Sequence, residues 1–262
     1  MRKMKLLFGL LLMVGFATAG DTLQLKTTLG DMRVVLYENT PRHAAYYKAR
    51  FQEGQYEGTL FTRVVKDFVI QGGALDSRNA PAGARVGAGS RYHLLMPEFR
   101  KDNVPYKGVL GAPRESGKNN PQKKSDASQF FIVQGQRYTS GYLDSLEMTA
   151  NNPIKNAWWK EHYMPQKAVM DSLKVNDPKT FNERLRALKA EMNEMLAAHP
   201  DALVFTEEQR RRLTTDGGAL HLMNEYTFFG EVVEGMQVID AIGHLKTDAN
   251  ERPYTDVVIR TR

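Results

Sequence analysis

The thirteen residues Phe61–Gly73 read FTRVVKDFVIQGG, and the rest of the chain is best interpreted from them. Apolar residues alternate with others across Phe61–Val65, which predicts a β-strand that places Arg63 on a face with apolar neighbours. A turn-like Lys-Asp pair follows, and Phe68–Gln71 predicts a second short strand that stops at two glycines. The stretch is therefore a predicted hairpin in which one arginine and one glutamine stand out from an apolar background.

The composition limits the classes of protein to which the chain can belong. The chain has 262 residues, no cysteine and a formal net charge of +6. Without cysteine it cannot use disulfides, so an apolar core has to stabilise it alone. Arg2, Lys3 and Lys5 lie in the first twenty residues, and without them the net charge falls to about +3. Such a mild excess of positive charge does not indicate a nucleic-acid-binding protein, so we expect no nucleic-acid partner. We also expect a monomer.

The first twenty residues are typical of a secretory signal peptide. Basic residues precede the apolar run Leu6–Phe16, and Ala17-Thr18-Ala19 fits a cleavage site made of small residues. The apolar run is short for a membrane span, although an anchor that stays uncleaved is the alternative. We therefore expect an exported, periplasmic protein whose mature chain, residues 21–262, has no membrane span.

The sequence after residue 20 predicts a mostly β domain. Beyond the opening hairpin, strands are predicted at LQLKTT and MRVVLY around a Gly30-Asp31 turn, and at SQFFIVQ, TFFGEVV and TDVVIR. Thr40 and Pro41 predict the N-cap and the first residue of a helix that ends at Gly54. Residues 72–128 are rich in Gly, Pro, Asn and Ser, which predicts long ordered loops.

Residues 136–220 differ from this pattern and predict a helical insertion. Asp177-Pro178 is a helix-capping pair, followed by apolar residues at three- and four-residue steps from Phe181 to Leu196. Thr206 and Gln209 have the spacing of a capping box at the start of a further helix. The domain of residues 21–262 is therefore expected to be interrupted by a separate helical segment.

The common catalytic motifs are absent from the sequence. There is no cysteine nucleophile, no GxSxG, no HExxH, no P-loop and no GxGxxG beside a strand. The glycine-rich run at residues 83–89 lacks the Lys-Ser/Thr ending of a phosphate-binding loop and predicts a plain loop. The six histidines show no metal-ligand spacing. We therefore expect neither a metal nor a cofactor.

Four segments together resemble the cyclophilin-type peptidyl-prolyl isomerases. These segments are FTRVVKDFVIQGG, GVLGAPRESG at Gly108–Gly117, ASQFFIV at Ala127–Val133 and HLMNEYTFFGEVVEGM at His221–Met236. They lie in order within residues 21–135 and 221–262, so the resemblance does not cover the helical insertion. It implies a mainly β fold, namely a closed eight-stranded antiparallel barrel with two capping helices, and an enzyme that acts on proline-containing polypeptides.

The resemblance implies that Arg63 and Gln71 are catalytic. Rotation about an X-Pro bond meets a barrier of about 18–20 kcal/mol, because the amide loses its resonance. In the twisted transition state the proline nitrogen becomes pyramidal and accepts a hydrogen bond, which it does poorly when planar. A fixed guanidinium donor would therefore bind the transition state preferentially. This chemistry requires no acid, base, nucleophile or metal.

The resemblance also implies the residues that bind the substrate. The proline ring would contact four apolar side chains: Phe68, Val69, Phe131 and Leu222. The peptide backbone would be held by Gln71 and Gln129, with Gly72-Gly73 turning the chain beside the groove. Many members have asparagine and histidine where this chain has Arg114 and Tyr226, and some have tryptophan where it has His221. We expect these three changes to alter subsite preference rather than the reaction.

Three functions fit these features. The first is an exported prolyl isomerase that assists protein folding, which X-Pro rotation can limit. The second is a binding module that grips proline-containing segments while the insertion recruits a partner, but binding alone would not need Arg63. The third is a chaperone-like surface made by Trp158-Trp159, Tyr163 and Met164, although packing of the insertion on the barrel explains these residues more simply.

Overall fold

The computed structural model describes residues 21–87, 94–115 and 117–261. The chain divides into two compact units. The first, the barrel unit, ends at Gln134 and resumes at Ala219, and the second, the helical unit, is Gly135–Gly218. All strands of the main sheet lie in the barrel unit, whereas the helical unit contains helices α2 to α5. The predicted signal peptide lies outside the described residues.

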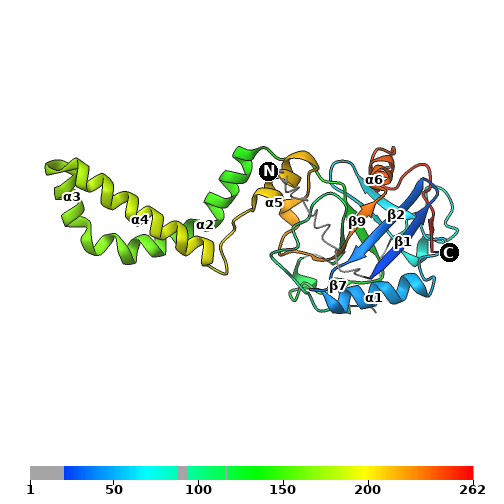
Figure 1. Ribbon diagram of the computed structural model, residues 1–262. Helices are drawn as coiled ribbons and strands as arrows, with labels where there is room; N and C mark the ends of the chain where they lie inside the picture. Colours follow the sequence, from blue (N-terminus) through cyan, green and yellow to red (C-terminus); the bar gives the residue numbers. More distant parts are fainter. Residues whose placement is uncertain (1–20, 88–93, 116, 262) are drawn as a thin grey trace, which may run out of the picture. The chain divides into compact units, whose positions relative to one another are not determined.

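The barrel unit is a sheet of eight antiparallel strands (Figure 1). The strands follow the order β10-β1-β2-β9-β6-β8-β4-β3. Leu60, just before β3, bridges Val258, just before β10, and this contact brings the two edges of the sheet together. The strands are β1 Thr22–Thr27, β2 Gly30–Leu36, β3 Phe61–Val65, β4 Val69–Gly72, β6 Val109–Ala112, β8 Phe130–Val133, β9 Thr227–Glu234 and β10 Ile259–Arg260, with β5 Leu94–Leu95 and β7 Ser125–Asp126 as a separate pair. The predicted eight-stranded barrel is confirmed.

One central strand, β6, was not predicted from the local sequence pattern. β6 (Val109–Ala112) pairs with both β8 and β9, although it lies in the region predicted to be loops. Its four residues follow Gly108 and precede Pro113, so its pattern is too short to distinguish from a loop. The last strand is also shorter than predicted and comprises only Ile259–Arg260.

The first hairpin turns two residues earlier than predicted. Thr27 pairs with Gly30, so the loop consists of Thr28-Leu29 and not of Gly30-Asp31. The Thr27 hydroxyl donates to the Gly30 carbonyl at 2.8 Å and closes this two-residue loop. A side-chain hydrogen bond thus helps to set the turn, and Gly30 begins the second strand.

The β3–β4 hairpin departs from the simple alternation predicted for it. Phe61 pairs with Gly72 and Arg63 with Gln71, so Thr62 is an additional residue that forms a β-bulge. Phe61 and Thr62 are both buried, whereas Arg63 is half-buried. The bulge therefore removes Arg63 from the buried face that Phe61 occupies. Phe68 lies in the turn, and the second strand begins at Val69.

The glycines that end this hairpin are needed for packing. Gly73 has a φ of +93°, and a Cβ atom there would lie 2.9 Å from the ring of Tyr56. At Gly72 a Cβ atom would lie 3.0 Å from the Leu60 carbonyl oxygen. The close approach of the buried Tyr56 ring thus accounts for Gly73, without any reference to a substrate groove.

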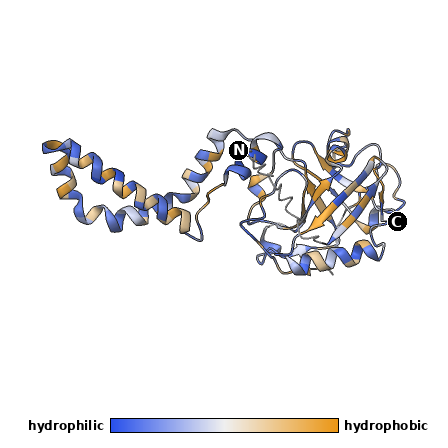
Figure 2. Ribbon diagram, viewed as in Figure 1, coloured by the Kyte–Doolittle hydropathy of each residue, from blue (hydrophilic) through white to orange (hydrophobic). Residues whose placement is uncertain are grey.

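Two helices, α1 (Pro41–Gln52) and α6 (Met236–Gly243), complete the apolar core of the barrel unit. Helix α1 contributes Tyr47 and Phe51, and α6 contributes Val238, Ile239 and Ile242. The ring of Tyr47 stacks on Phe229 of β9 with centroids 3.9 Å apart, and its hydroxyl donates to the Gln129 carbonyl at 2.6 Å. Figure 2 shows apolar residues along the strands that these helices cover.

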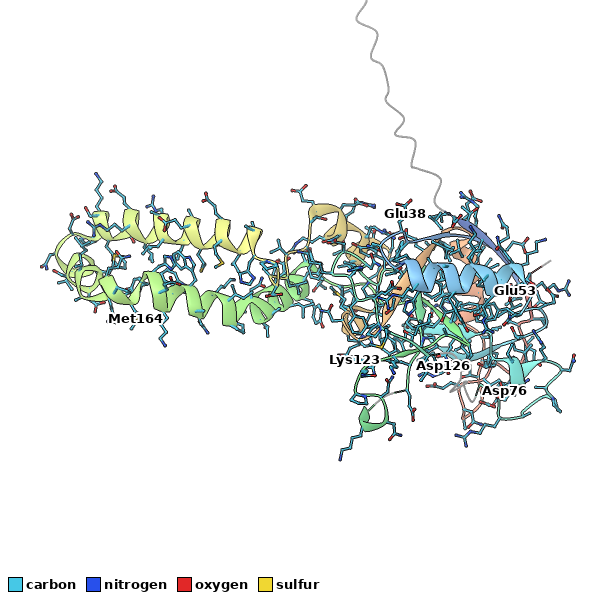
Figure 3. The ribbon with its side chains drawn as sticks, turned by 90° about the horizontal axis from the view of Figure 1, so that it is seen from below. Glu38, Glu53, Asp76, Lys123, Asp126 and Met164 are labelled. Atoms are coloured by element: carbon cyan, nitrogen blue, oxygen red, sulfur yellow. The ribbon has the colours of Figure 1, made fainter. Side chains whose placement is uncertain are left out.

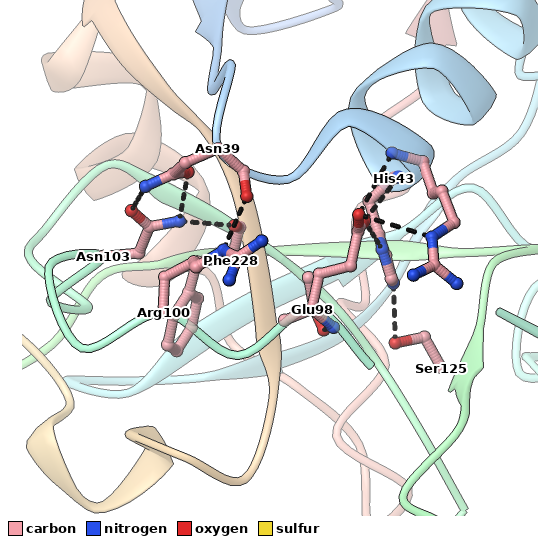
Figure 4. Close-up of polar contacts among 9 residues, drawn as sticks. Asn39, His43, Glu98, Arg100, Asn103, Ser125 and Phe228 are labelled. Atoms are coloured by element: carbon pink, nitrogen blue, oxygen red, sulfur yellow. Dashed lines mark hydrogen bonds and ion pairs between the residues drawn. The ribbon is translucent and has the colours of Figure 1, made fainter. Parts of the chain in front are cut away.

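The first backbone N–H groups of α1 bond to Glu98 (Figure 4). Thr40 occupies the predicted N-cap position, but its side chain does not cap the helix. The Glu98 carboxylate accepts the backbone N–H groups of Arg42 at 3.3 Å and His43 at 3.0 Å. The Thr40 hydroxyl makes no capping bond, and among the described residues it is buried without a partner. A carboxylate at a helix N-terminus also interacts favourably with the helix dipole. A distant acidic residue has thus taken the role that the local sequence assigned to Thr40.

Glu98 also belongs to a buried hydrogen-bond network with His43 and Ser125. His43 Nδ1 lies 2.6 Å from Glu98 Oε2, and His43 Nε2 lies 3.0 Å from Ser125 Oγ. Burial lowers the pKa of His43, and the Glu98 hydrogen bond offsets this only in part. Burial would raise the pKa of Glu98, but hydrogen bonds from His43 and Arg42 outweigh it and lower that pKa. At neutral pH a neutral imidazole therefore bonds to an ionised carboxylate.

These three residues have the composition of a hydrolase triad but not its accessibility. Serine, histidine and glutamate are linked in the usual order, yet the His43 side chain is fully buried and Ser125 is only 2% exposed. None of the three borders the cavities described below. A nucleophile has to reach its substrate, so we assign this network a structural role.

The unfolding free energy should fall as the pH is lowered from about 6.5, the pKa of an unperturbed histidine. Because the pKa of His43 is lower in the folded protein than in the unfolded chain, the unfolded chain binds the proton first on acidification. The unfolding free energy then falls by at most about 1.4 kcal/mol per pH unit. The lowered pKa of Glu98 reduces the unfolding free energy further only below about pH 4.3, the pKa of an unperturbed glutamate.

Denaturant unfolding of the parent and His43→Asn proteins between about pH 7.5 and 5 tests this prediction. The variant should be less stable at the upper pH and should lose less stability on acidification. His244→Asn, at an exposed histidine, should keep the parental slope. Equal slopes for the parent and His43→Asn would contradict the prediction.

The helical unit contains four α-helices: α2 Ser140–His162, α3 Lys167–Asn176, α4 Pro178–Ala198 and α5 Glu207–Thr215. Two predicted helix starts are confirmed. The Asp177 side chain accepts the Thr180 N–H before α4, and Thr206 and Gln209 form both bonds of a capping box before α5. The helical unit spans Gly135–Gly218, and the predicted insertion was placed at about residues 136–220.

The helical unit has an apolar core of its own. Trp158 packs there with Met170 and Leu188, and Trp159 and Tyr163 pack against this cluster. Contacts within the unit therefore account for these aromatic residues. Met164, labelled in Figure 3, is 54% exposed.

Candidate active site

A cavity of about 280 Å³ is bordered by residues from four separate segments of the barrel unit. Its lining consists of Arg63, Phe68, Val69, Gln71, Pro113, Arg114, Phe131, Leu222 and Tyr226. All of these except Pro113 are predicted site residues. The two remaining predicted residues, Gln129 and His221, do not line the cavity, but each contacts a residue that does.

The wall of the cavity is aromatic and tightly packed. The Phe131 ring meets Tyr226 edge-on, with centroids 5.5 Å apart and planes at 88°. Behind it lies Gly111 of β6, where a Cβ atom would come within 2.1 Å of the Phe131 ring. Phe131 and Leu222 are 3% and 5% exposed. Glycine at position 111 thus leaves room for the ring that forms the apolar wall.

Arg63 is the half-buried cation at the edge of this wall. Its Nε donates to Glu251 Oε2 at 2.5 Å, and its Cζ lies 6.0 Å from the centroid of the Phe68 ring. Among the described residues, neither terminal nitrogen of Arg63 has an acceptor. Sequence reasoning missed Glu251, which is 188 residues away and carries no local signal.

Gln71 is oriented by Gln129. Gln71 Nε2 donates to Gln129 Oε1 at 3.1 Å, and Gln129 Nε2 donates to the Gly87 carbonyl at 3.3 Å. Gln129 is 2% exposed, and its bond to the Gly87 carbonyl fixes the orientation of its amide. The structure therefore places Gln71 on the cavity and Gln129 in support of it, whereas the resemblance suggested that both hold the peptide.

The Arg114 side chain is engaged with the protein itself. Its Nε donates to the Glu225 carbonyl at 2.7 Å, and its Nη2 donates to the Glu225 carboxylate at 2.5 Å. Lys123 bonds to the same carboxylate at 2.7 Å, and this bond, together with the charge of Arg114, lowers the pKa of Glu225. Arg114 therefore fixes the segment that carries Leu222 and Tyr226 and also covers the Tyr226 ring.

His221 lies at the rim rather than in the cavity. It is exposed, and its ring packs against Phe68 with centroids 5.0 Å apart. The Phe68 ring thus lies close to both the His221 ring and the Arg63 guanidinium. His221 influences the cavity through the position of Phe68.

A second cavity, of about 590 Å³, adjoins the first. Arg63 and Gln71 border both, and the remaining lining residues are Thr62, Arg85, Val86, Gly87 and Asn250. Sequence reasoning predicted none of these five as site residues. Thr62 lies in the opening motif, and Arg85, Val86 and Gly87 lie in the glycine-rich run predicted to be a plain loop. Arg63 and Gln71 therefore lie at the junction of two adjoining cavities.

Residues 21–87, 94–115 and 117–261 contain neither a candidate metal site nor a helix that could span a membrane. Within these ranges no three His, Asp or Glu side chains are grouped so that they could hold a metal ion. In the same ranges no helix has both the length and the apolar character needed to span a membrane.

The chain matches the family described as cyclophilin type peptidyl-prolyl cis-trans isomerase/CLD over residues 22–150 and 212–262, more than half of its length. The chain belongs to the cyclophilin family. The match leaves out residues 151–211, which lie within the helical unit. As a member of this isomerase family the chain is a peptidyl-prolyl cis-trans isomerase, and proline-containing peptides are its substrates. The roles of single site residues stay predictions.

Two named relatives and one crystal structure are similar to this cyclophilin. A Streptococcus pyogenes protein named as a bifunctional phosphatase/peptidyl-prolyl cis-trans isomerase is 26% identical over 92% of this chain. The chain spans only 38% of that relative's length. A Staphylococcus epidermidis protein named as a peptidyl-prolyl cis-trans isomerase is 24% identical over 90% of this chain and 87% of its own length.

The crystal structure is that of a cyclophilin-type isomerase from Cryptosporidium parvum in the presence of the dipeptide Ala-Pro. It has a TM-score of 0.50 at 16% identity and covers 92% of this chain and 96% of its own. At this level of identity the similarity supports the fold alone.

Proposed function

We propose that this cyclophilin accelerates X-Pro rotation in exported proteins through a hydrogen bond from Arg63 to the proline nitrogen of the twisted transition state. The observation that carries the proposal is the setting of Arg63. It is a half-buried cation beside an apolar wall, bonded at Nε, with both terminal nitrogens lacking an acceptor among the described residues.

The required acceleration is within reach of such a site. Uncatalysed X-Pro rotation takes tens to hundreds of seconds. Rotation in milliseconds needs roughly 10⁴–10⁵-fold acceleration, or about 5.5–7 kcal/mol. A donor aimed at the developing lone pair supplies about 2.7–4 kcal/mol, judged from oxyanion-hole donors. The remainder comes from holding the proline ring against Phe131 and Leu222, with the peptide backbone bonded to Gln71.

A direct assay separates catalysis from binding. Rotation of short X-Pro peptides is followed without a coupling protease, and turnover should exceed the uncatalysed rate by orders of magnitude. The Ala-Pro dipeptide named with the Cryptosporidium structure supports the choice of Ala-Pro in this peptide series. Tight peptide binding with near-uncatalysed rotation would favour the proline-binding module instead.

Export rests on the character of the first twenty residues, which are basic, then apolar, then small. We expect the mature protein in the periplasm, where it acts on exported chains. Expression of the full chain, cell fractionation and mass analysis of the recovered N-terminus test this. A periplasmic product starting near residue 21 supports export, and a product that retains Met1 in the cytoplasm opposes it.

The barrel unit should fold and catalyse without the helical unit. Gln136 and Gly218 exchange two backbone hydrogen bonds of 3.0 Å, so the ends of the helical unit lie close together. Replacing Gly135–Gly218 by a short Gly-Ser linker should keep cooperative unfolding and leave tetrapeptide turnover within about threefold, because both cavities are lined by the barrel unit. Loss of the unfolding transition would show that the helical unit belongs to the folding core.

A further inference from the structure

Glu251 lies in a loop that is fixed at several points. The loop follows α6 and is closed by a bridge between Thr247 and Pro253. The Asp248 side chain accepts the backbone N–H groups of Asn250 at 2.7 Å and Arg252 at 3.0 Å. Glu251 has a φ of +64°, which a non-glycine residue adopts only where its surroundings impose it. The loop therefore holds Glu251 in one backbone conformation.

The neighbouring Arg252 anchors this loop to the barrel unit. Its side chain donates to the carbonyls of Pro81 and Ala84 at 3.1 and 2.7 Å and to the Asp256 carboxylate at 2.8 Å. Arg252 is 3% exposed, so these charge-assisted bonds are shielded from water. The backbone of Glu251 is thus placed without help from its own side chain.

Glu251 contacts β3 twice, once through its backbone and once through its carboxylate. Its carbonyl accepts the Val64 N–H at 2.8 Å, and its Oε2 accepts from Arg63 Nε at 2.5 Å. The backbone bond brings Glu251 next to Arg63, and the carboxylate then takes the Nε–H. Because Nε is the bonded atom, the terminal nitrogens remain available where Arg63 borders both cavities.

We propose that Glu251 positions Arg63 for catalysis, an inference that rests on the proposed function of Arg63. A free arginine side chain samples many rotamers, and ordering it during the reaction would cost free energy. A donor that is already in place requires no such reorganisation at the transition state. The two side chains are 39% and 43% exposed, so the ion pair contributes little to stability. Catalysis and stability should therefore respond differently to its loss.

Glu251→Ala should lower kcat by about 10-fold and leave KM within about twofold, because the pocket for the proline is intact. The thermal midpoint should change by no more than about 2 °C. Glu251→Gln keeps an acceptor oxygen at the same reach and should restore kcat to within about threefold of the parent. Glu234→Ala removes a carboxylate from an ion pair outside the site, with Arg33, and serves as the matched control with unchanged kcat.

The same comparison in the Arg63→Ala background tests whether Glu251 acts through Arg63. There the Glu251→Ala change should have no further effect on kcat. In the NMR spectrum, the Nε–H signal of Arg63, assigned by its loss in Arg63→Ala, should exchange with solvent faster in Glu251→Ala than in the parent.

Three results would overturn the inference. The first is a kcat for Glu251→Ala within twofold of the parent, and the second is an equal loss of kcat with and without Arg63. Normal turnover of Arg63→Ala would instead reject the proposed mechanism, and the role of Glu251 would be rejected with it. The first two results leave the mechanism of Arg63 intact, so the two failures are distinguishable.

Discussion

Arg63→Ala should reduce turnover of an X-Pro peptide by about 100- to 1000-fold, the scale of losing one oxyanion-hole donor at about 2.7–4 kcal/mol. Peptide affinity should weaken only a few-fold, because the apolar wall of Phe131 and Leu222 remains. Arg63→Lys should recover little, since lysine has no Nε–H to donate to Glu251 and its flexible ammonium group lacks the planar terminal donors of a guanidinium. Turnover and ground-state affinity of both variants are the measurements.

The pH profile gives an independent test of the same mechanism. A guanidinium does not titrate below about pH 12, so turnover of the parent should be nearly flat from about pH 6 to 9. An acid–base pair would give a bell-shaped profile instead. Arg33→Ala removes a half-buried arginine of β2 that does not line either cavity and is the matched control. Near-normal turnover of Arg63→Ala, or a steep profile in the parent, would reject a catalytic donor at position 63.

Glu98→Ala should destabilise the protein by about 3–5 kcal/mol, the largest effect expected outside the active site. The substitution leaves the His43 ring and two backbone N–H groups of α1 without their acceptor in a buried setting. For a chain of this size the thermal midpoint should fall by roughly 10 °C. Denaturant and thermal unfolding of the variant at neutral pH are the measurements.

Two further variants make this test specific. Glu98→Gln retains one acceptor oxygen but turns an NH₂ group toward donors, so it should lose about half as much stability as the alanine variant. Glu234→Ala removes an exposed carboxylate and should change stability by no more than about 0.5 kcal/mol. A Glu98→Ala protein as stable as Glu234→Ala would show that the buried network contributes little.

The barrel was expected from the family resemblance, and the mostly β character of the domain was predicted from local patterns that survive in the folded chain. Alternation along Thr22–Leu36 and the apolar runs at Phe130–Val133 and Thr227–Glu234 correspond to real strands, because a half-buried strand needs an apolar face. β6 was missed because Gly111 is a packing residue, which leaves space for Phe131 and weakens the strand pattern. Thr40 occupies the predicted N-cap position, but its side chain makes no capping bond, because the partner of the helix start need not be close in sequence.

The residues of the candidate site were recognisable for a similar reason. Arg63, Gln71 and Phe131 lie in short motifs whose residue types and order can be read without knowing the fold. Sequence reasoning could not show that Gln129 accepts a hydrogen bond from Gln71, nor that Arg114, which borders the cavity, bonds to Glu225. These orientations depend on hydrogen-bond partners from other strands and loops.

The sequence by itself therefore determined the family, the barrel and the identity of the central arginine, because strand periodicity and motif order are properties of neighbouring residues. Only the tertiary structure showed that a β-bulge at Thr62 releases Arg63 from the buried face and that Glu251 takes its Nε–H. Both depend on register and on a contact across 188 residues, which the chain acquires only when the barrel brings its strands together. No local pattern encodes such a contact, since either partner alone would be an ordinary charged surface residue.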